Sequence, residues 1–162
     1  MGASIYPPPA SQMPRIVALQ NLENIPSASY VVDETIQFTQ TFTAIANRHY
    51  KVTFQMANVD TDGTTGSAYI SKVAAITTCR VNPGTTVTTT SNEIGQIYTP
   101  VFGDDSMRDG GVVGVFWIER PPAGLNTVAI SLKTSLTTAG GVRYLAYGDG
   151  NRLAIEDAGP AV

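Results

Sequence analysis

Residues His49–Met56, with the sequence HYKVTFQM, alternate polar and apolar side chains without a break. Successive side chains of a β-strand point to opposite faces, so the apolar residues would share one face and the polar residues the other. The apolar face would consist of Tyr50, Val52, Phe54 and Met56. The stretch therefore predicts a strand that buries one face in a core and exposes the other to water.

The same period of two recurs on both sides of this strand. Before it, the apolar residues of Glu34–Thr43 fall mainly on one face, and Ala44–Arg48 would form the connection. No window after residue 28 has a convincing helical period. Further strands are expected at Ala68–Arg80, Val112–Glu119, Thr127–Lys133, Val142–Tyr147 and Arg152–Ile155.

Turn-forming residues separate the expected strands. Turns are expected at Asp60–Gly63, Asn82–Gly84 and Arg120–Gly124, and Thr85–Ser91 would be a connection or an edge strand. Gly148–Asn151 would close a hairpin between the last two strands. Roughly eight or nine short strands with regular turns predict an all-β fold, an antiparallel, jelly-roll-like β-sandwich over residues 29–162.

The composition agrees with a single β-rich domain. The chain has 162 residues, and only 14% of them are charged, against roughly 25% in an average globular protein. Its polarity comes largely from twenty threonines, whose branched side chains fit a pleated sheet better than a helix. This excludes a coiled coil, a helical bundle and a charged disordered tail. The net charge of -3 also argues against nucleic-acid binding, which needs a basic surface.

Targeting and redox signals are few. Cys79 is the single cysteine, so no internal disulfide is expected, and with one histidine the sequence has no zinc-ligand spacing. Prolines occupy the position where the apolar region of a signal peptide would lie, and no apolar run approaches the ~20 residues that span a bilayer. We expect a soluble protein made inside the cell, with no membrane contact.

Residues 1–28 differ from the rest and are predicted to form a docking arm rather than part of the core. Three consecutive prolines favour an extended path. The later part suits either a short helix, from an apolar residue at every third position, or an added edge strand. The arm would bind a partner by strand addition or by laying apolar residues into a groove. The expected contact residues are Ile5, Tyr6, Pro7, Pro8, Pro9, Ile16, Val17 and Leu19.

Residues that could carry chemistry all have a simpler interpretation. His49 would lie on the wet face of its strand, without a nucleophile motif to pair with it. Asp60, Asp62 and Gly63 resemble the start of a calcium loop, but its twelfth position is Ser71 instead of a glutamate. A solvated loop is the preferred interpretation of the acidic cluster near residue 105, with a cation site as the alternative; its members are Asp104, Asp105 and Asp109.

Trp117 is expected in the core, because it shares a strand face with Val113 and Val115. The alternative is a sugar-stacking platform formed with Phe116 and Tyr98. Cys79 is expected to act as a small hydrophobe. Since none of these candidates is stronger than its structural interpretation, we expect no catalytic residue, no cofactor and no metal, and therefore no enzyme.

Two segments resemble a known family. Leu153–Pro160, LAIEDAGP, is similar to the hydrophobic-x-Val/Ile-Glu-Asp-Ile/Leu-Gly-Pro ending of β-sandwich virion proteins from tailed phages of actinobacteria. Phe42–Val52, FTAIANRHYKV, resembles the F-T-A-V-A-G-R-R-Y-R-V segment of that family, with Asn47 and His49 replacing Gly and Arg. Ala158 replaces a larger aliphatic residue. The residues that carry the resemblance are Tyr50, Leu153, Ile155, Glu156, Asp157, Gly159 and Pro160.

These motifs also have a structural interpretation. Asn47 can adopt the left-handed conformation that glycine would supply at the entry to a strand. Leu153 and Ile155 would complete a sandwich face. Glu156–Asp157 would mark where the strand leaves the sheet, and Gly159–Pro160 would end it.

The resemblance implies a structural role on the surface of a phage particle, without catalytic residues. A capsid decoration or head-fibre protein is expected, which binds the major capsid protein or another virion protein and forms homotrimers. The first alternative is a minor tail protein or a receptor-binding domain that contacts a host-surface glycan. The others are a free-standing carbohydrate-binding module and a hydrolase that uses His49.

Overall fold

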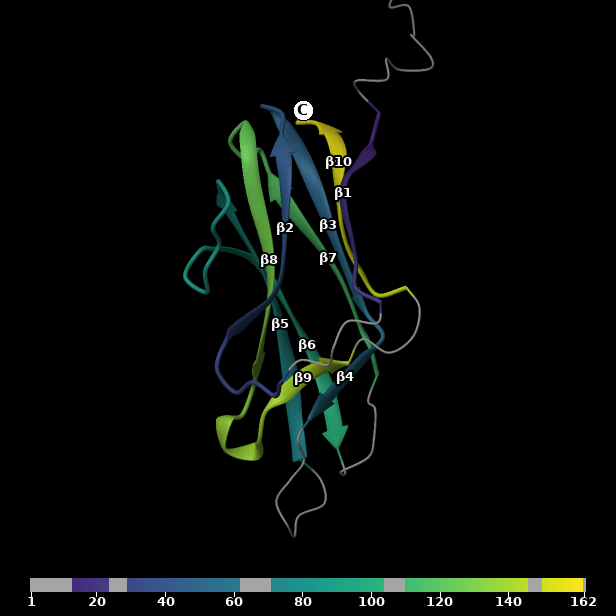
Figure 1. Ribbon diagram of the computed structural model, residues 1–162, viewed down its shortest axis with the longest axis vertical. Helices are drawn as coiled ribbons and strands as arrows, with labels where there is room; N and C mark the ends of the chain where they lie inside the picture. The colour runs from purple at the N-terminus through teal and green to yellow at the C-terminus, as the bar shows by residue number, and fades with distance from the viewer. Residues whose placement is uncertain (1–12, 24–28, 62–70, 104–109, 146–149, 162) are drawn as a thin grey trace, which may run out of the picture.

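The computed structural model describes residues 13–23, 29–61, 71–103, 110–145 and 150–161. These residues form an all-β antiparallel sandwich, as predicted (Figure 1). The strands are β1 (Arg15–Asn21), β2 (Thr35–Ala44), β3 (Arg48–Met56), β4 (Asn58–Thr61), β5 (Ser71–Pro83), β6 (Asn92–Gly103), β7 (Val112–Glu119), β8 (Gly124–Thr134), β9 (Val142–Leu145) and β10 (Arg152–Pro160).

Two four-stranded sheets make the sandwich. Sheet I has the strand order β1-β10-β3-β7, and sheet II has the order β2-β8-β5-β6. A third, two-stranded sheet of β4 and β9 lies toward the lower end of the sandwich in Figure 1. The chain crosses from sheet II to sheet I between β2 and β3, so these neighbours in sequence face each other across the core.

The HYKVTFQM segment lies in β3, at the centre of sheet I, and its predicted faces are confirmed. Tyr50, Val52, Phe54 and Met56 are buried, while the residues between them are partly exposed. The ring of Phe54 packs against Tyr144 of β9, with centroids 5.4 Å apart. Burying such aromatic side chains supplies much of the free energy of a core. The described residues contain no helix long and apolar enough to cross a membrane.

The segment predicted as an arm contributes to the sandwich. Arg15–Asn21 forms β1, an edge strand that pairs antiparallel with β10 (Figure 1). Leu22, which follows it, is 1% exposed and belongs to the core. The prediction that residues 1–28 lie outside the core is therefore wrong for Leu22. The strand forms because β10 offers an unpaired backbone edge and because inward residues such as Ala18 pack against the core.

The predicted hairpin between the last two strands is wrong. β9 pairs with β4, whereas β10 pairs with β1 and β3. The hydroxyl of Tyr144 lies 2.6 Å from Oγ1 of Thr77 inside the core. Burial of the Tyr144 side chain holds β9 beside β4. The turn-forming residues between β9 and β10 do not predict this contact. β4 also takes Asp60 and Thr61 into a strand, where a turn was predicted.

A strand that the sequence did not predict is β6, which pairs with β5 at the edge of sheet II. It contains Gly95 and Pro100, two residue types that weaken a strand pattern. Proline is tolerated at a sheet edge because its missing N–H can face away from the ladder. The neighbouring Thr85–Ser91 is a connection, one of the two predicted alternatives.

The face of β7 is the reverse of the prediction. Val113, Val115 and Trp117 are 65%, 53% and 52% exposed. The buried residues of β7 are instead Val112, Phe116 and Ile118. Because β7 is apolar on both faces, a period of two does not say which face is inward.

Candidate functional site: the outer face of sheet I

The segments Phe42–Val52 and Leu153–Pro160, which the sequence analysis singled out, lie side by side. β3 and β10 pair antiparallel, with Tyr50 opposite Asp157 and Arg48 opposite Pro160. Beyond the strand end, the backbone N–H of Ala161 donates to the carbonyl of Asn47 at 2.8 Å. The two segments therefore form one structural unit rather than two separate sites.

A buried ion pair joins the two segments. Nε of Arg48 donates to Oδ1 of Asp157 at 2.6 Å, and both side chains are almost fully buried. The same carboxylate oxygen accepts the N–H of Gly159 at 3.1 Å. Gly159 has φ = 116° and lies where the register between β10 and β3 shifts. The prediction that Glu156–Asp157 marks the strand's departure is wrong, since β10 continues to Pro160.

Tyr50 fixes the crossing between the two sheets. Its hydroxyl accepts the N–H of Ile45 at 2.7 Å, and its ring packs on Phe42 with centroids 4.9 Å apart. In the same connection, Asn47 has φ = 57°, which confirms the predicted left-handed conformation. Tyr50, Leu153, Ile155 and Asp157 are thus buried, and their role is to hold β3, β10 and the connection together.

The residues between these buried positions form the outer face of sheet I. The register aligns them in rows across β1, β10, β3 and β7. One row is Ile16, Glu156, Lys51 and Trp117; the next is Leu19, Ala154, Thr53 and Val115; the third is Asn21, Arg152, Gln55 and Val113. Apolar side chains lie at both edges, and polar side chains lie mainly between them.

A depression of about 280 Å³ lies beside β1 on this face. Ile16 and Leu19 form its apolar rim, and each is 58% exposed. Lys51 and Glu156 form an ion pair within it. The remaining lining residues are Thr53, Arg152 and Ala154. The depression therefore combines exposed aliphatic groups with the Lys51–Glu156 ion pair and the guanidinium of Arg152.

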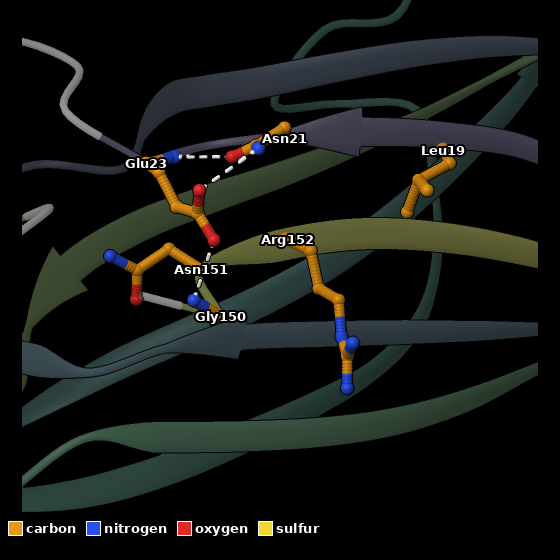
Figure 2. A pocket seen from close by; sticks show the side chains of 6 residues that line it. All are labelled: Leu19, Asn21, Glu23, Gly150, Asn151 and Arg152. Carbon is orange, nitrogen blue, oxygen red and sulfur yellow. Dashed lines mark hydrogen bonds between the residues drawn. The ribbon is translucent and has the colours of Figure 1, made fainter. Parts of the chain in front are cut away.

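A smaller pocket of about 160 Å³ continues the face toward the end of β1 (Figure 2). Glu23 lies over the start of β10 and accepts the N–H of Gly150 at 2.7 Å and an amide N–H of Asn21 at 3.1 Å. The hydrogen bond from Gly150 holds the pKa of Glu23 below its ordinary value. Because its carboxylate already accepts these bonds, Glu23 ties β1 to β10, and the pocket is better explained by structure than by catalysis.

The predicted chemical candidates are not brought together. His49 is partly exposed on the outer face of sheet I, as expected. Burial raises the pKa of Cys79, so its thiol stays neutral and unreactive. Asp60 accepts hydrogen bonds from Tyr30 and Arg143 at 2.7 and 2.9 Å, which gives it a structural role. Within the described ranges, no group of three His, Cys, Asp or Glu could hold a metal ion.

Several predicted residues fall outside the described part of the chain. These are Asp62, Gly63, Asp104, Asp105 and Asp109 of the two candidate cation loops, and Ile5, Tyr6, Pro7, Pro8 and Pro9 of the arm. Of the other arm residues, Ile16 and Leu19 are exposed, while Val17 is partly buried and packs against the core. The sequence analysis did not predict that Val113, Val115 and Trp117 of β7 are exposed. The one signal for it in the sequence is that β7 has more apolar residues than a single buried face needs.

No curated protein matches the chain in sequence. A family model described as "Domain of unknown function (DUF7298)" matches residues 1–162. The chain therefore belongs to the DUF7298 family.

Proposed function

We propose that the chain is a non-enzymatic structural protein of a bacteriophage virion. It would be a capsid decoration or head-fibre protein that binds and stabilises the capsid surface. The support from sequence is the resemblance of Phe42–Val52 and Leu153–Pro160 to actinobacteriophage virion proteins. The support from structure is that these segments pair with each other, so the resemblance covers a real structural unit.

The observation that carries the proposal is the apolar rim of sheet I on β1. Ile16 and Leu19 are more than half exposed on an edge strand next to the polar depression. Exposed aliphatic groups rimmed by polar residues are typical of protein contact sites. The partner would be the major capsid protein or another virion protein, and the proline-rich residues before β1 would extend the contact.

Self-association would strengthen this attachment. Many identical copies on a regular lattice compound modest affinities through avidity. A trimer is the favoured assembly by resemblance to related sandwich domains, and the location would be the particle surface.

Electron microscopy of virions labelled with an antibody to this chain tests the location. Label on the head supports a decoration or head-fibre protein. Label on the tail contradicts it and supports the alternative of a minor tail protein or receptor-binding domain. Absence of label from intact particles contradicts both.

A sedimentation experiment tests the surface. The double variant Ile16→Ser/Leu19→Ser should stay folded but no longer co-sediment with particles that lack the native chain. Tyr98→Ser is the matched control, because Tyr98 is 60% exposed but lies on β6 of the other sheet. Equal binding by the double variant and the control would contradict the assigned surface.

One observation favours the receptor-binding alternative. Trp117 is 52% exposed and lies opposite the polar Lys51 of the neighbouring strand. An exposed indole beside hydrogen-bonding groups is suited to stacking on a sugar ring. Binding of the chain to host cell-wall glycans, lost in Trp117→Ala, would support this alternative.

A further inference from the structure

The free edge of β7 differs from the other edges of the two large sheets. In the described part of the chain, the edge strands of these sheets are β1, β2, β6 and β7. The first three each contain a β-bulge, in which one extra residue interrupts the pairing: Val17 in β1, Gln37 in β2 and Ile94 in β6. β7 instead pairs with β3 through eight consecutive residues without a register shift. Bulges protect an edge from pairing with a further strand, and β7 lacks this protection.

The side chains of β7 do not protect its edge either. Proline and lysine commonly block an edge strand, and β7 contains neither; its one charged residue is Glu119, the last of the strand. Three apolar side chains on its outer face, here called the β7 strip, are more than half exposed: Val113, Val115 and Trp117. Among the described residues, β7 has no strand partner other than β3. An unprotected apolar edge of this kind is a template for pairing with another chain.

The backbone groups of the β7 strip point toward the free edge. The N–H of Leu22 donates to the carbonyl of Asn151 at 2.9 Å, so the backbone groups of Asn151 point toward β1. This direction alternates along a strand, so the groups of Ala154, three residues later, point toward β3 and Thr53. Thr53 therefore points toward β10, and Val115, opposite Thr53 on β7, points away from β3. The other members of the β7 strip share this direction, because they lie two residues away on either side.

We propose that β7 pairs with β7 of a second copy of the chain, antiparallel about a two-fold axis at Val115. The two four-stranded copies of sheet I would then form one continuous sheet. In this register, Val115 lies opposite the same residue of the other copy, and Val113 lies opposite Trp117. The N–H and carbonyl groups of the two β7 strips would form about six hydrogen bonds across the axis.

The strand is complementary to itself in this register. Aromatic and β-branched residues form favourable cross-strand pairs, and the register makes two Val113–Trp117 pairs around the central valines. Glu119 would lie opposite Gly111, so the two negative charges stay at opposite ends of the shared edge. A second copy therefore supplies a strand of the same length with apolar side chains at the required spacing.

This pairing is a property of the isolated chain. It is two-fold, so it differs from the trimer proposed above, and it stands whether or not the chain is a virion component. An isologous contact of this kind closes after two copies, because each β7 edge is used once.

Cysteine cross-linking tests the register. In Val115→Cys the two introduced thiols belong to directly opposite residues, whose Cα atoms lie about 5.5 Å apart in a hydrogen-bonded antiparallel pair. A disulfide spans this distance, so mild oxidation should give a covalent dimer. Val113→Cys is the matched control, because the two introduced thiols would be separated by four residues along the strands, about 13 Å, and should not cross-link. Cys79 is buried and should not react.

Sedimentation equilibrium tests the association without a cross-link. The average mass should rise from that of one chain toward that of two over about 1–500 μM, as for a small interface. Val115→Pro removes an N–H that points to the free edge and leaves the pairing with β3 intact, so the dissociation constant should rise about tenfold. Leu19→Pro is the control: Leu19 lies opposite Ala154, so its N–H points to the free edge of β1. It should dimerise like the unchanged protein, and circular dichroism checks that both variants stay folded.

The outcomes separate the pairing from other assemblies. Cross-linking in Val115→Cys but not in Val113→Cys, with a mass that rises with concentration, supports the proposal. The mass of one chain at every concentration overturns it, and a trimer without dimers overturns it in favour of the assembly proposed above. Equal weakening by Val115→Pro and Leu19→Pro, or equal cross-linking of the two cysteine variants, also overturns it.

Discussion

The outer faces of the two sheets carry different kinds of side chain. On sheet II, Glu34, which immediately precedes β2, reaches across β8 and accepts two hydrogen bonds from Arg80 on β5, at 2.7 and 2.9 Å. Arg80 also donates to Glu93 on β6, and Ser131 of β8 donates to Glu34. One polar network thus links β5, β6 and β8 to the residue that precedes β2. Sheet I instead leaves Val113, Ile16 and other apolar side chains exposed at its edges.

This difference indicates which face is available for contacts. The network on sheet II satisfies its own charges and leaves Arg80 only 8% exposed. Binding a partner there would have to disrupt hydrogen bonds that already exist. Burying the apolar side chains at the edges of sheet I breaks no such hydrogen bonds, so it would be favourable. Around Arg80, sheet II therefore satisfies its own polar groups, which is why the proposed contact face is assigned to sheet I.

Breaking the network should have the largest effect on stability. Glu34→Ala removes the carboxylate that pairs with Arg80 and leaves a nearly buried guanidinium with weaker partners. The free energy of unfolding should fall by about 3 kcal/mol, as for other disrupted buried pairs. Urea unfolding followed by circular dichroism measures this. Glu156→Ala, which breaks an exposed pair, is the control; equal losses in the two variants would contradict the comparison.

Acid should weaken sheet II through the same carboxylate. The hydrogen bond from Arg80 holds the pKa of Glu34 below its ordinary value of 4.5. A lowered pKa in the folded state means that this contribution to stability is fully present above pH 4.5. It is lost as the pH falls from there through the folded-state pKa. Unfolding free energies measured from neutral pH downward should show this loss, which Glu34→Gln should reduce. An identical acid slope in Glu34→Gln would show that other carboxylates dominate.

The fold class followed from local patterns, but the pairing of strands did not. The alternation in HYKVTFQM marks a strand with one buried face, because side-chain direction is a local property of the backbone. Which strand pairs with which depends on contacts distant in sequence. The insertion of Tyr144 beside Thr77 decides the place of β9, and these residues are far apart in the chain. Gly95 and Pro100 likewise weaken the strand pattern of β6, so this edge strand was not predicted.

The candidate site was harder to predict than the fold. The network around Arg80 joins residues of three strands with Glu34 before β2, so no sequence spacing reveals it. The burial of Asp157 depends on Arg48, which lies on another strand. The exposed face of β7 could not be assigned because both of its faces are apolar. By contrast, the left-handed Asn47 was predictable, since that conformation depends on the residue itself.

The exposed ion pair on sheet I should matter much less than the network on sheet II. Lys51 and Glu156 are each about one-third exposed, at 34% and 32%. Water and salt screen such a pair, so Lys51→Ala should cost only about 0.5 kcal/mol. Thermal unfolding at low and high salt measures it, and the difference from the unchanged protein should shrink as salt is added. A loss as large as that of Glu34→Ala would mean that both outer faces depend on charge networks.

The smallest effect is expected at the apolar edge of β7, where two neighbouring valines give a matched pair. Val113→Thr replaces a methyl group that is largely in water, so the free energy of unfolding should change by less than about 0.5 kcal/mol. Val112→Thr makes the same replacement at a position that is 2% exposed. There the new hydroxyl enters the core, and the cost should be about 2 kcal/mol. Urea unfolding of both variants measures the difference. Similar losses would contradict the assignment of Val113 to the outer face of β7, and a reversed order would show that β7 faces the other way.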